Sequence, residues 1–366
     1  MSAPRLEIDL DKIHHNASIL VDRLAFQGIS VTGVMKSSLG SPEIARVLLS
    51  AGVSMLGDSR IENIERMRCA GIEEPMLLLR SPMMSQVETV VSCADISLNS
   101  ELVVIRKLSS AAKAIGKIHG VILMVELGDL REGIMPADLE GAVREILTLP
   151  SIILKGIGAN LACHSGVSPD ERNMNELSAL ANSIETTFGL TLDIVSGGNS
   201  ANLDWAFSGE GMGRINNLRL GESIMLGCEP LHRKPIEKLY TDAFSLVAEV
   251  IESKVKPSLP WGTIAQTAFG LKSASTDRGD IAQAILALGH QDVDPGGLQG
   301  PPGTVVIGAS SDHLIIDSGA DRLMVGAELR FQLNYSALVR LMTSPFVSKV
   351  LRCVPIKDIS PMKTPV

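Results

Sequence analysis

The fold is decided by the stretch VTGVMKSSLGSPEIARVLLSAGVSMLGDSRIENIERMRCA, residues Val31–Ala70. It contains the same pattern twice: a short apolar strand candidate, Val31–Met35 and then Val53–Leu56, is followed by an amphipathic segment, Ser41–Ala51 and then Ser59–Ala70. In both amphipathic segments the apolar residues recur at three- and four-residue spacing, which is typical of helices. Buried strands that alternate with helices indicate βα units and a parallel sheet.

The same alternation continues through the first 220 residues, with further helix candidates at Ser100–Ala114 and Glu171–Phe188. Eight βα units predict an α/β fold of the (β/α)8 TIM-barrel type. The alternative is an open, doubly wound sheet, but no G-x-G-x-x-G motif follows the first strand. The eight strand candidates are Val31–Met35, Val53–Leu56, Met76–Leu79, Asp95–Leu98, His119–Val125, Ile152–Ile157, Leu192–Val195 and Ile215–Leu218.

The pattern changes to β-type strands after the segment LHRKPIEK (Leu231–Lys238). We therefore expect a barrel over residues 11–230 and a smaller, mainly β domain over residues 231–366, joined by the early strand Arg5–Leu10. Glycine and proline gather between the later strands, as in DPGGLQGPPG, before a short helix at Tyr335–Arg340. The later strand candidates are Phe244–Ile251, Ile281–Leu288, Thr304–Ile307, Leu314–Ile316 and Glu328–Leu333.

Composition narrows the classes of function. A length of 366 residues suits two domains, and 45% hydrophobic with 20% charged residues is the profile of a globular protein. The net charge of −8 and an aromatic content of 3% argue against nucleic acid as a partner. The five cysteines include no C-x-x-C pair, which argues against a disulfide framework and a zinc ribbon. The N-terminus MSAPRLEIDL has no signal-peptide pattern and no apolar run reaches membrane length, so we expect a cytoplasmic protein.

Three segments at strand ends could carry chemistry, since barrel enzymes use the loops that follow their strands. Lys36 follows the first strand, where a desolvated amine would be nucleophilic and could form a Schiff base. The structural alternative is a strand-end lysine that reaches solvent. The segments SGGNS (Ser196–Ser200) and LRLGES (Leu218–Ser223) stand where these barrels bind phosphate. Lysine and phosphate together suit pyridoxal phosphate, or an aldolase that acts on a sugar phosphate.

Several runs of residues, in order along nearly the whole chain, resemble the alanine racemase superfamily, and most closely its ornithine and lysine racemase branch. The runs are IDLDKIHHN (Ile8–Asn16), VMKS (Val34–Ser37), DSRIENI (Asp58–Ile64), ADISLNSE (Ala94–Glu101), VELGDLREG (Val125–Gly133), SGGNS (Ser196–Ser200), NLRLGES (Asn217–Ser223) and GASSDHLIID (Gly308–Asp317).

The resemblance implies a pyridoxal-phosphate enzyme in which Lys36 holds the cofactor covalently. It implies that Arg219 faces the pyridine nitrogen and, because arginine does not readily lose a proton, leaves that nitrogen unprotonated. Arg131 matches an arginine that contacts the phenolic oxygen, and Asn160 falls where the family has a histidine beside the ring. The remaining contacts that the resemblance implies are Ser196, Gly197, Gly198, Asn199, Ser200, Gly221, Glu222 and, on the phosphate in place of a tyrosine, Thr343.

In the β domain the resemblance places Ser310, Ser311 and Asp312 on a segment that reaches the partner's active site and contacts substrate. It therefore implies a head-to-tail homodimer. His290 falls on the family's catalytic tyrosine, and an imidazole can move a proton near neutral pH. The alternative is that His290 is a polar strand-end residue and that another group, such as Asp292, moves the proton.

The family's second tyrosine is replaced by Gly40, so both departures from the pattern of alanine racemase argue against alanine as substrate. We expect a racemase that interconverts the L and D forms of ornithine, lysine or arginine by two-base abstraction of the α-proton. The alternatives are a non-catalytic pyridoxal-phosphate carrier and a lyase on the same scaffold. No metal site is predicted, because the neighbouring Asp312 and His313 are too few ligands for zinc.

Overall fold

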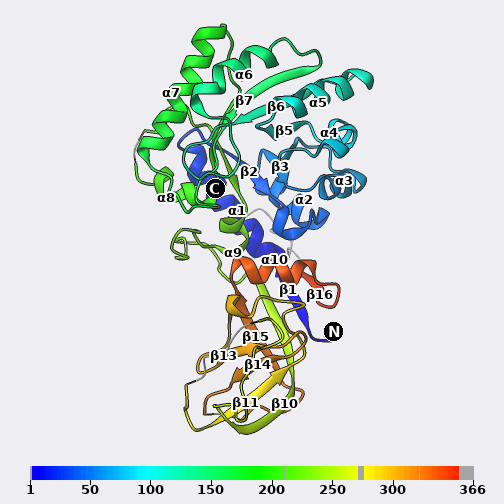
Figure 1. Ribbon diagram of the computed structural model, residues 1–366, viewed down its shortest axis with the longest axis vertical. Helices are drawn as coiled ribbons and strands as arrows, with labels where there is room; N and C mark the ends of the chain where they lie inside the picture. The colour runs from blue at the N-terminus through cyan, green and yellow to red at the C-terminus, as the bar shows by residue number, and fades with distance from the viewer. Residues whose placement is uncertain (1, 210, 271–275, 321, 354–366) are drawn as a thin grey trace, which may run out of the picture. The chain divides into compact units, whose positions relative to one another are not determined.

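The computed structural model describes residues 2–209, 211–270, 276–320 and 322–353 (Figure 1). The chain forms two compact units. One unit is Ile13–Asp242, and the other combines Met1–Lys12 with Ala243–Val366.

The first unit is a closed barrel of eight parallel strands, β2 to β9 in chain order, so the predicted (β/α)8 barrel is confirmed. The barrel closes where β2 pairs with β9, with Thr32 opposite Arg219. Helices lie around the strands, as the blue-to-green ribbon in Figure 1 shows. The strands are β2 (Ser30–Val34), β3 (Met55–Asp58), β4 (Met76–Leu78), β5 (Ile96–Asn99), β6 (His119–Met124), β7 (Ile152–Gly158), β8 (Ile194–Gly198) and β9 (Asn217–Leu220).

The helices between these strands carry one buried apolar face each, which packs against the barrel. No helix among the described residues is long and apolar enough to cross a membrane. The α-helices of this part of the chain are α1 (Leu10–Ala25), α2 (Pro42–Ser50), α3 (Ile61–Cys69), α4 (Val87–Cys93), α5 (Leu102–Ala114), α6 (Leu139–Ile146), α7 (Glu171–Phe188), α8 (Leu203–Ala206) and α9 (Glu222–Leu226). Short 3-10 turns lie at η1 (Lys36–Ser38), η2 (Met84–Gln86), η3 (Pro136–Asp138) and η4 (Ser200–Asn202).

The inside of the barrel has an apolar part and a polar part. Leu77, Leu98, Ile122 and Met124 come from neighbouring strands and pack into one buried cluster with Ile96. Strands β2, β8 and β9 carry buried polar side chains instead of a buried apolar cluster. Because buried polar groups must be hydrogen-bonded to be tolerated, this side of the barrel is where a polar ligand fits.

The second unit is mainly β, as predicted. Its sheet runs in the order β12-β15-β10-β11-β14-β13, and β1 pairs with β10 and β16. Figure 1 shows β1, in dark blue, beside strands drawn in yellow and orange. The elements are β1 (Arg5–Asp9), β10 (Phe244–Pro257), β11 (Asp280–Leu286), η5 (Pro295–Gly297), β12 (Leu298–Gln299), β13 (Val305–Ala309), β14 (Leu314–Asp317), β15 (Glu328–Leu333), α10 (Tyr335–Thr343) and β16 (Ser348–Arg352).

A buried carboxylate joins three strands of this sheet, β1, β15 and β16. Glu7 on β1 is 3% exposed and forms ion pairs with Arg5 at 3.0 Å, Arg330 at 2.5 Å and Arg352 at 2.6 Å. Burial raises the pKa of Glu7, but hydrogen bonds from Arg330 and Arg5 outweigh it and leave that pKa below its usual value. Arg5 lies on the same strand, whereas Arg330 and Arg352 reach Glu7 only when β15 and β16 are in place.

The division between the units lies after Asp242, later than the boundary at residue 231 that the sequence suggested. The intervening segment stays with the barrel because it is hydrogen-bonded there. The Glu229 carboxylate accepts the backbone N–H groups of His232 and Lys234. The Asn16 side chain on α1 donates to the Tyr240 carbonyl at 2.8 Å and accepts from the Tyr240 N–H at 2.8 Å.

Candidate active site

Lys36 lies in a tight turn just beyond the end of β2. The carbonyl of Met35 accepts the N–H groups of Ser38 at 3.0 Å and Gly40 at 3.3 Å, and Leu39 has a left-handed backbone with a φ of 53°. Lys36 itself is exposed, whereas its neighbours Met35 and Ser37 are buried. The expectation of a desolvated amine is therefore wrong for the chain alone, because the turn carries Lys36 past the end of the buried strand.

Gly40 closes this turn where no other residue would fit. Its φ is +63°, and an added Cβ would lie 2.7 Å from the Asn63 carbonyl oxygen and 2.8 Å from the Asn63 Cβ. Both facts exclude a large side chain at this position. The close approach of helix α3 therefore requires a glycine at position 40.

Arg219 is a buried cation inside the barrel. It is 4% exposed and donates through Nη2 to the Ala159 carbonyl at 2.8 Å and through Nη1 to the Ser196 hydroxyl. Burial, together with the positive charge of Arg131, lowers the pKa of Arg219 to about 10, so it remains protonated at neutral pH. Among the described residues, none of the carboxylates forms an ion pair with it. A buried cation held by neutral groups is suited to an electron-rich ligand atom.

Two segments that the sequence analysis treated as loops finish or form strands instead. Ser196–Gly198 ends β8, and Arg219 lies within β9. The glycines belong there because of crowding: a Cβ on Gly197 would lie 2.8 Å from Ile215 Cγ2, and Gly198 has a φ of +149°. The Ser196 hydroxyl donates to Asn217 Oδ1 at 2.8 Å. The strand ends are therefore fixed, and so is the direction of Ser196 toward Arg219.

The ends of β8 and β9 are joined by two hydroxyl groups. Ser200 Oγ lies 2.9 Å from Ser223 Oγ and accepts the backbone N–H groups of Ser223 at 3.2 Å and Gly221 at 3.4 Å. The Glu222 carboxylate is paired with Arg233, which leaves only the backbone of Glu222 for a ligand. Ser223 was missed as a site residue, although the LRLGES segment contained it. Hydroxyl and backbone N–H donors gathered in this way suit a phosphate group.

Asn160 presents an unused donor beside Arg219. Its Oδ1 accepts from Asn199 Nδ2 at 3.1 Å and from Arg219 Nη2 at 3.4 Å. Its Nδ2 is buried and has no hydrogen-bond partner among the described residues. An unpaired buried donor is costly, so this atom is expected to meet an acceptor on a ligand.

Arg131 lies on a loop that two carboxylates hold in place. The Glu126 carboxylate accepts the N–H groups of Gly128 at 2.6 Å, Leu130 at 3.0 Å and Arg131 at 3.2 Å. Asp129 accepts the N–H groups of His164 at 2.9 Å, Ser165 at 3.1 Å and Cys163 at 3.2 Å. The Arg131 side chain pairs with Glu132 and donates to the Cys163 sulfur at 2.6 Å. Sequence reasoning did not identify these loop-holding carboxylates.

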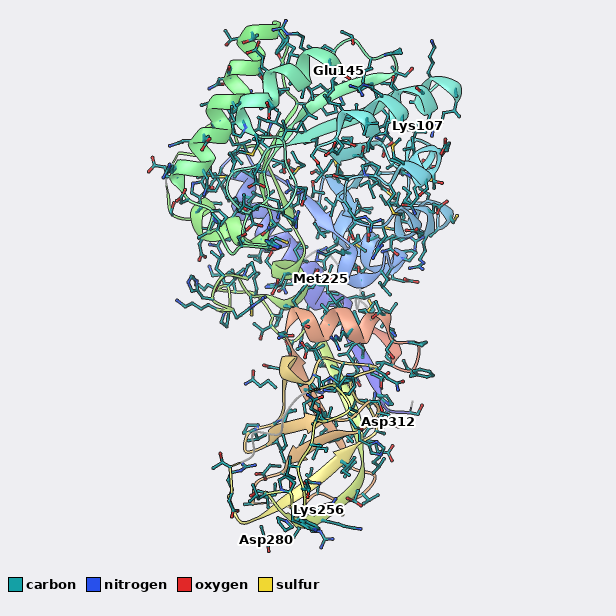
Figure 2. All side chains as sticks on the ribbon, in the orientation of Figure 1. Lys107, Glu145, Met225, Lys256, Asp280 and Asp312 are labelled. Carbon is teal, nitrogen blue, oxygen red and sulfur yellow. The ribbon has the colours of Figure 1, made fainter. Side chains whose placement is uncertain are left out.

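In the β domain, the structure brings His290 and the turn Ser310–Asp312 together. The His290 N–H donates to the Ser310 carbonyl at 2.9 Å, and an added Cβ on Gly289 would lie 2.5 Å from that same oxygen. Asp312 Oδ1 lies 2.7 Å from His313 Nδ1, and this hydrogen bond lowers the pKa of Asp312. Figure 2 shows Asp312 nearer to helix α10 than Asp280, which lies at the end of the β10–β11 ribbon.

Asp292 and Thr343 have local structural partners. The buried Asp292 accepts the Ser344 hydroxyl at 2.6 Å and the Gly289 N–H at 3.4 Å, which ties the end of α10 to the His290 loop. The Thr343 hydroxyl donates to the Arg340 carbonyl of its own helix at 2.9 Å. The structure joins Thr343 to none of the other candidate residues that it describes.

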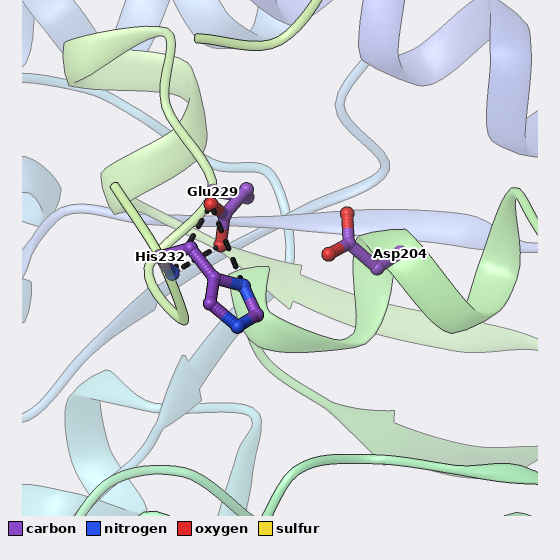
Figure 3. Close-up of side chains that lie close together, drawn as sticks. All are labelled: Asp204, Glu229 and His232. Carbon is purple, nitrogen blue, oxygen red and sulfur yellow. Dashed lines mark hydrogen bonds and ion pairs between the residues drawn. The ribbon is translucent and has the colours of Figure 1, made fainter. Parts of the chain in front are cut away.

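One group of three possible metal ligands lies outside these sites, counting the described residues only. The ligand atoms of Asp204, Glu229 and His232 lie within 4.8 Å of one another (Figure 3). Both oxygens of Glu229 already accept backbone N–H groups of the turn that follows, and Asp204 and His232 are exposed. Holding that turn accounts for the buried Glu229, and we assign no metal to this group.

Comparisons with known proteins agree with this geometry. The model of the alanine racemase N-terminal domain matches residues 8–230. The chain is 40% identical to the ornithine racemase of Acetoanaerobium sticklandii over 352 residues, which cover 95% of this chain and 99% of that protein. It is also 40% identical to the lysine racemase of Thermotoga maritima over 352 residues, or 96% of this chain and 99% of that protein.

Solved structures share the fold at lower sequence identity. The alanine racemase of a D-cycloserine-producing Streptomyces lavendulae superposes with a TM-score of 0.73 at 20% identity, covering 97% of this chain and 98% of that one. The alanine racemase of Streptomyces coelicolor A3(2) gives 0.75 at 19% identity, with 95% and 97% covered. At these identities the likeness establishes the two-domain fold and no more.

Proposed function

Because this chain belongs to the alanine racemase family and is an amino-acid racemase, we propose that it uses pyridoxal phosphate to interconvert the L and D forms of a basic amino acid. The basic amino acids that we propose as substrates are ornithine, lysine and arginine. The relatives that cover nearly the whole chain at 40% identity are an ornithine racemase and a lysine racemase. The alternative of a lyase on the same scaffold has support from the fold alone: the D-threonine aldolase of Filomicrobium marinum superposes with a TM-score of 0.71 at 18% identity.

The residues of the barrel fit pyridoxal phosphate, and the observation that carries this is the unpaired Asn160 Nδ2 beside the buried Arg219. Ser200 and Ser223 would hold the phosphate, and Lys36 would attach the aldehyde carbon. When bound, the cofactor supplies an electron sink that makes the α-proton of the substrate acidic. Arg219, already donating to Ser196 and Ala159, would donate to the ring nitrogen without giving up its proton.

Two bases would move the α-proton. Lys36, released when the substrate takes its place, would take or return the proton on one face. His290 would serve the other face, since an imidazole can act in either direction near neutral pH. The backbone bonds from His290 and Gln291 to the turn Ser310–Ser311 support a shared role for these two loops of the β domain.

We expect ornithine and lysine to be racemised about 10²-fold faster than alanine, or more, because a site that binds a distal ammonium leaves its acceptors unpaired when alanine occupies it. The measurement is kcat/KM for each purified L-amino acid, followed by chiral chromatography. The Lys36→Ala variant serves as the blank. If alanine is the best substrate, the proposed substrate class is wrong, while membership of the family stands.

We also propose a head-to-tail homodimer in which the β domain of one chain completes the barrel site of the other. Lys36→Ala and Asp312→Ala chains, inactive alone, are then expected to complement each other when mixed as unfolded chains and refolded together. Half of the dimers are mixed and each has one intact site, so about a quarter of the wild-type activity returns.

The control for this experiment is each variant refolded alone, with its dimer mass checked by light scattering. Asp312 is exposed, and in the described part of the chain its carboxylate bonds to Ser310, Ser311 and His313 of its own turn, so the substituted chain is expected to fold. Two dimeric, inactive variants that show no recovery on mixing would disprove shared sites.

A further inference from the structure

A chain of polar contacts links the buried end of β3 to the turn that carries Lys36. Asn63 Nδ2 donates to both oxygens of Asp58, at 3.1 Å each. Arg66 Nη1 donates to Asn63 Oδ1 at 3.4 Å and also to the carbonyl of Leu39, three residues after Lys36. The contacts therefore run from Asp58 through Asn63 and Arg66 to the Lys36 turn.

The chemistry of these groups fixes the direction of every bond. An ionised Asp58 carboxylate can only accept, so the Asn63 amide must turn its NH2 group toward it. The Asn63 carbonyl oxygen then faces Arg66, which can only donate. Without the charge of Asp58, or without the guanidinium of Arg66, the Asn63 amide would no longer be held in this one orientation.

The turn needs such support. Leu39 adopts a left-handed conformation, which is unfavourable for a residue with a side chain. Gly40 packs against the backbone of Asn63, so the first turn of α3 and the Lys36 turn touch directly. Arg66 donates a hydrogen bond to the carbonyl of Leu39 and so helps to hold this residue in its left-handed conformation.

Asp58 lies at the buried end of this chain of contacts. It is fully buried at the end of β3, the strand next to β2. Burial raises the pKa of Asp58 to about 6, while hydrogen bonds from Arg60 and Asn63 and the positive charge of Lys36 oppose that rise.

We propose that Asp58, Asn63 and Arg66 are positioning residues for Lys36, which hold the turn at residues 36–40 so that the lysine amine meets the cofactor in one geometry. This inference rests on the proposed attachment of pyridoxal phosphate to Lys36. No covalent step is assigned to these three residues; they act through the backbone of the turn.

The test compares Arg66→Met with Arg68→Met in the cofactor-free, full-length protein. Arg68 is a matched control on the same helix, since its guanidinium bonds Asp95 at 2.6 Å and the Ile72 carbonyl at 2.9 Å instead of the Lys36 turn. In Arg66→Met, amide hydrogen exchange over residues 36–41 is expected to rise about tenfold, as the loss of one charge-assisted bond implies. In Arg68→Met this segment is expected to exchange as in the wild type.

The second measurement is the rate at which Lys36 condenses with added pyridoxal phosphate, located by borohydride reduction and peptide mass spectrometry. This rate is expected to fall about tenfold in Arg66→Met and Asp58→Asn, to stay within twofold in Arg68→Met, and to recover in Arg66→Lys, which keeps a donor. In the double variant Asp58→Asn/Arg66→Met, the rate of condensation is expected to be no lower than in the slower of the two single variants. Both substitutions interrupt the same series of contacts, so their effects should not add.

Equal effects in Arg66→Met and Arg68→Met, or a rate that falls only in step with the melting temperature, would overturn the inference. So would a loosened turn with an unchanged rate of condensation. If the wild type takes no cofactor on Lys36, the proposed function fails, and hydrogen exchange still decides whether the three residues hold the turn.

Discussion

Racemisation is expected to fall by at least about 10⁴-fold when Lys36 is replaced by alanine, because the change removes both the covalent attachment of the cofactor and one of the two bases. The wild type should be yellow, and borohydride should fix the cofactor on Lys36. The measurements are chiral chromatography of ornithine and peptide mass spectrometry of the reduced protein.

The matched control is Lys107→Ala on helix α5, an exposed lysine well away from the strand ends (Figure 2). It should remain yellow and active. Lys36 is itself exposed in a turn, so the Lys36→Ala chain is expected to fold. A reduced cofactor on a different lysine, or an active Lys36→Ala variant, would refute the assignment.

Replacing His290 with glutamine should stop racemisation in both directions, because the proton must leave one face of the α-carbon and return on the other. Glutamine keeps a polar side chain but cannot take up a proton at neutral pH. Exchange of the α-proton with deuterated solvent should survive for only one enantiomer, the one that Lys36 deprotonates. Proton NMR of each enantiomer in deuterated buffer measures this difference.

The control is His313→Gln, on the neighbouring turn, where the imidazole is bonded to Asp312. Near-normal racemisation in His290→Gln would remove His290 from the mechanism. Loss in His313→Gln instead would transfer the role to the Asp312–His313 pair. Asp292 is a weaker candidate for the second base than these residues, because its carboxylate is buried and already accepts the Ser344 hydroxyl.

The barrel could be predicted from the sequence because its strands are continuous apolar runs and its helices have a clear period. Glu171–Phe188 was predicted with the bounds that the structure gives to α7, where Asp170 caps the helix and Gly189 ends it. The second domain was harder, since strand β16 (SKVLR) is short, partly charged and stabilised by pairing with β1, which lies far away in the sequence. No local pattern could reveal such a strand.

The candidate site was predicted in part. Lys36 was proposed from its place at a strand end together with the family resemblance, and Arg219 from the resemblance alone. The exposure of Lys36, the hydroxyl pair Ser200–Ser223 and the role of Asn63 depend on contacts between separate βα units. Sequence spacing does not determine such contacts, because each is set by the packing of one loop against the next.

The pairing of β1 has a consequence for the order in which the protein is made. A ribosome synthesises β1 (Arg5–Asp9) before the barrel, whereas its partners β10 and β16 follow only after Asp242. A nascent barrel therefore carries β1 without its partner strands, and Glu7 without its pairs to Arg330 and Arg352. The pairs of Glu7 with Arg330 and Arg352 form only after β15 and β16 have been made, so β1 is made before the barrel but completes its contacts after it.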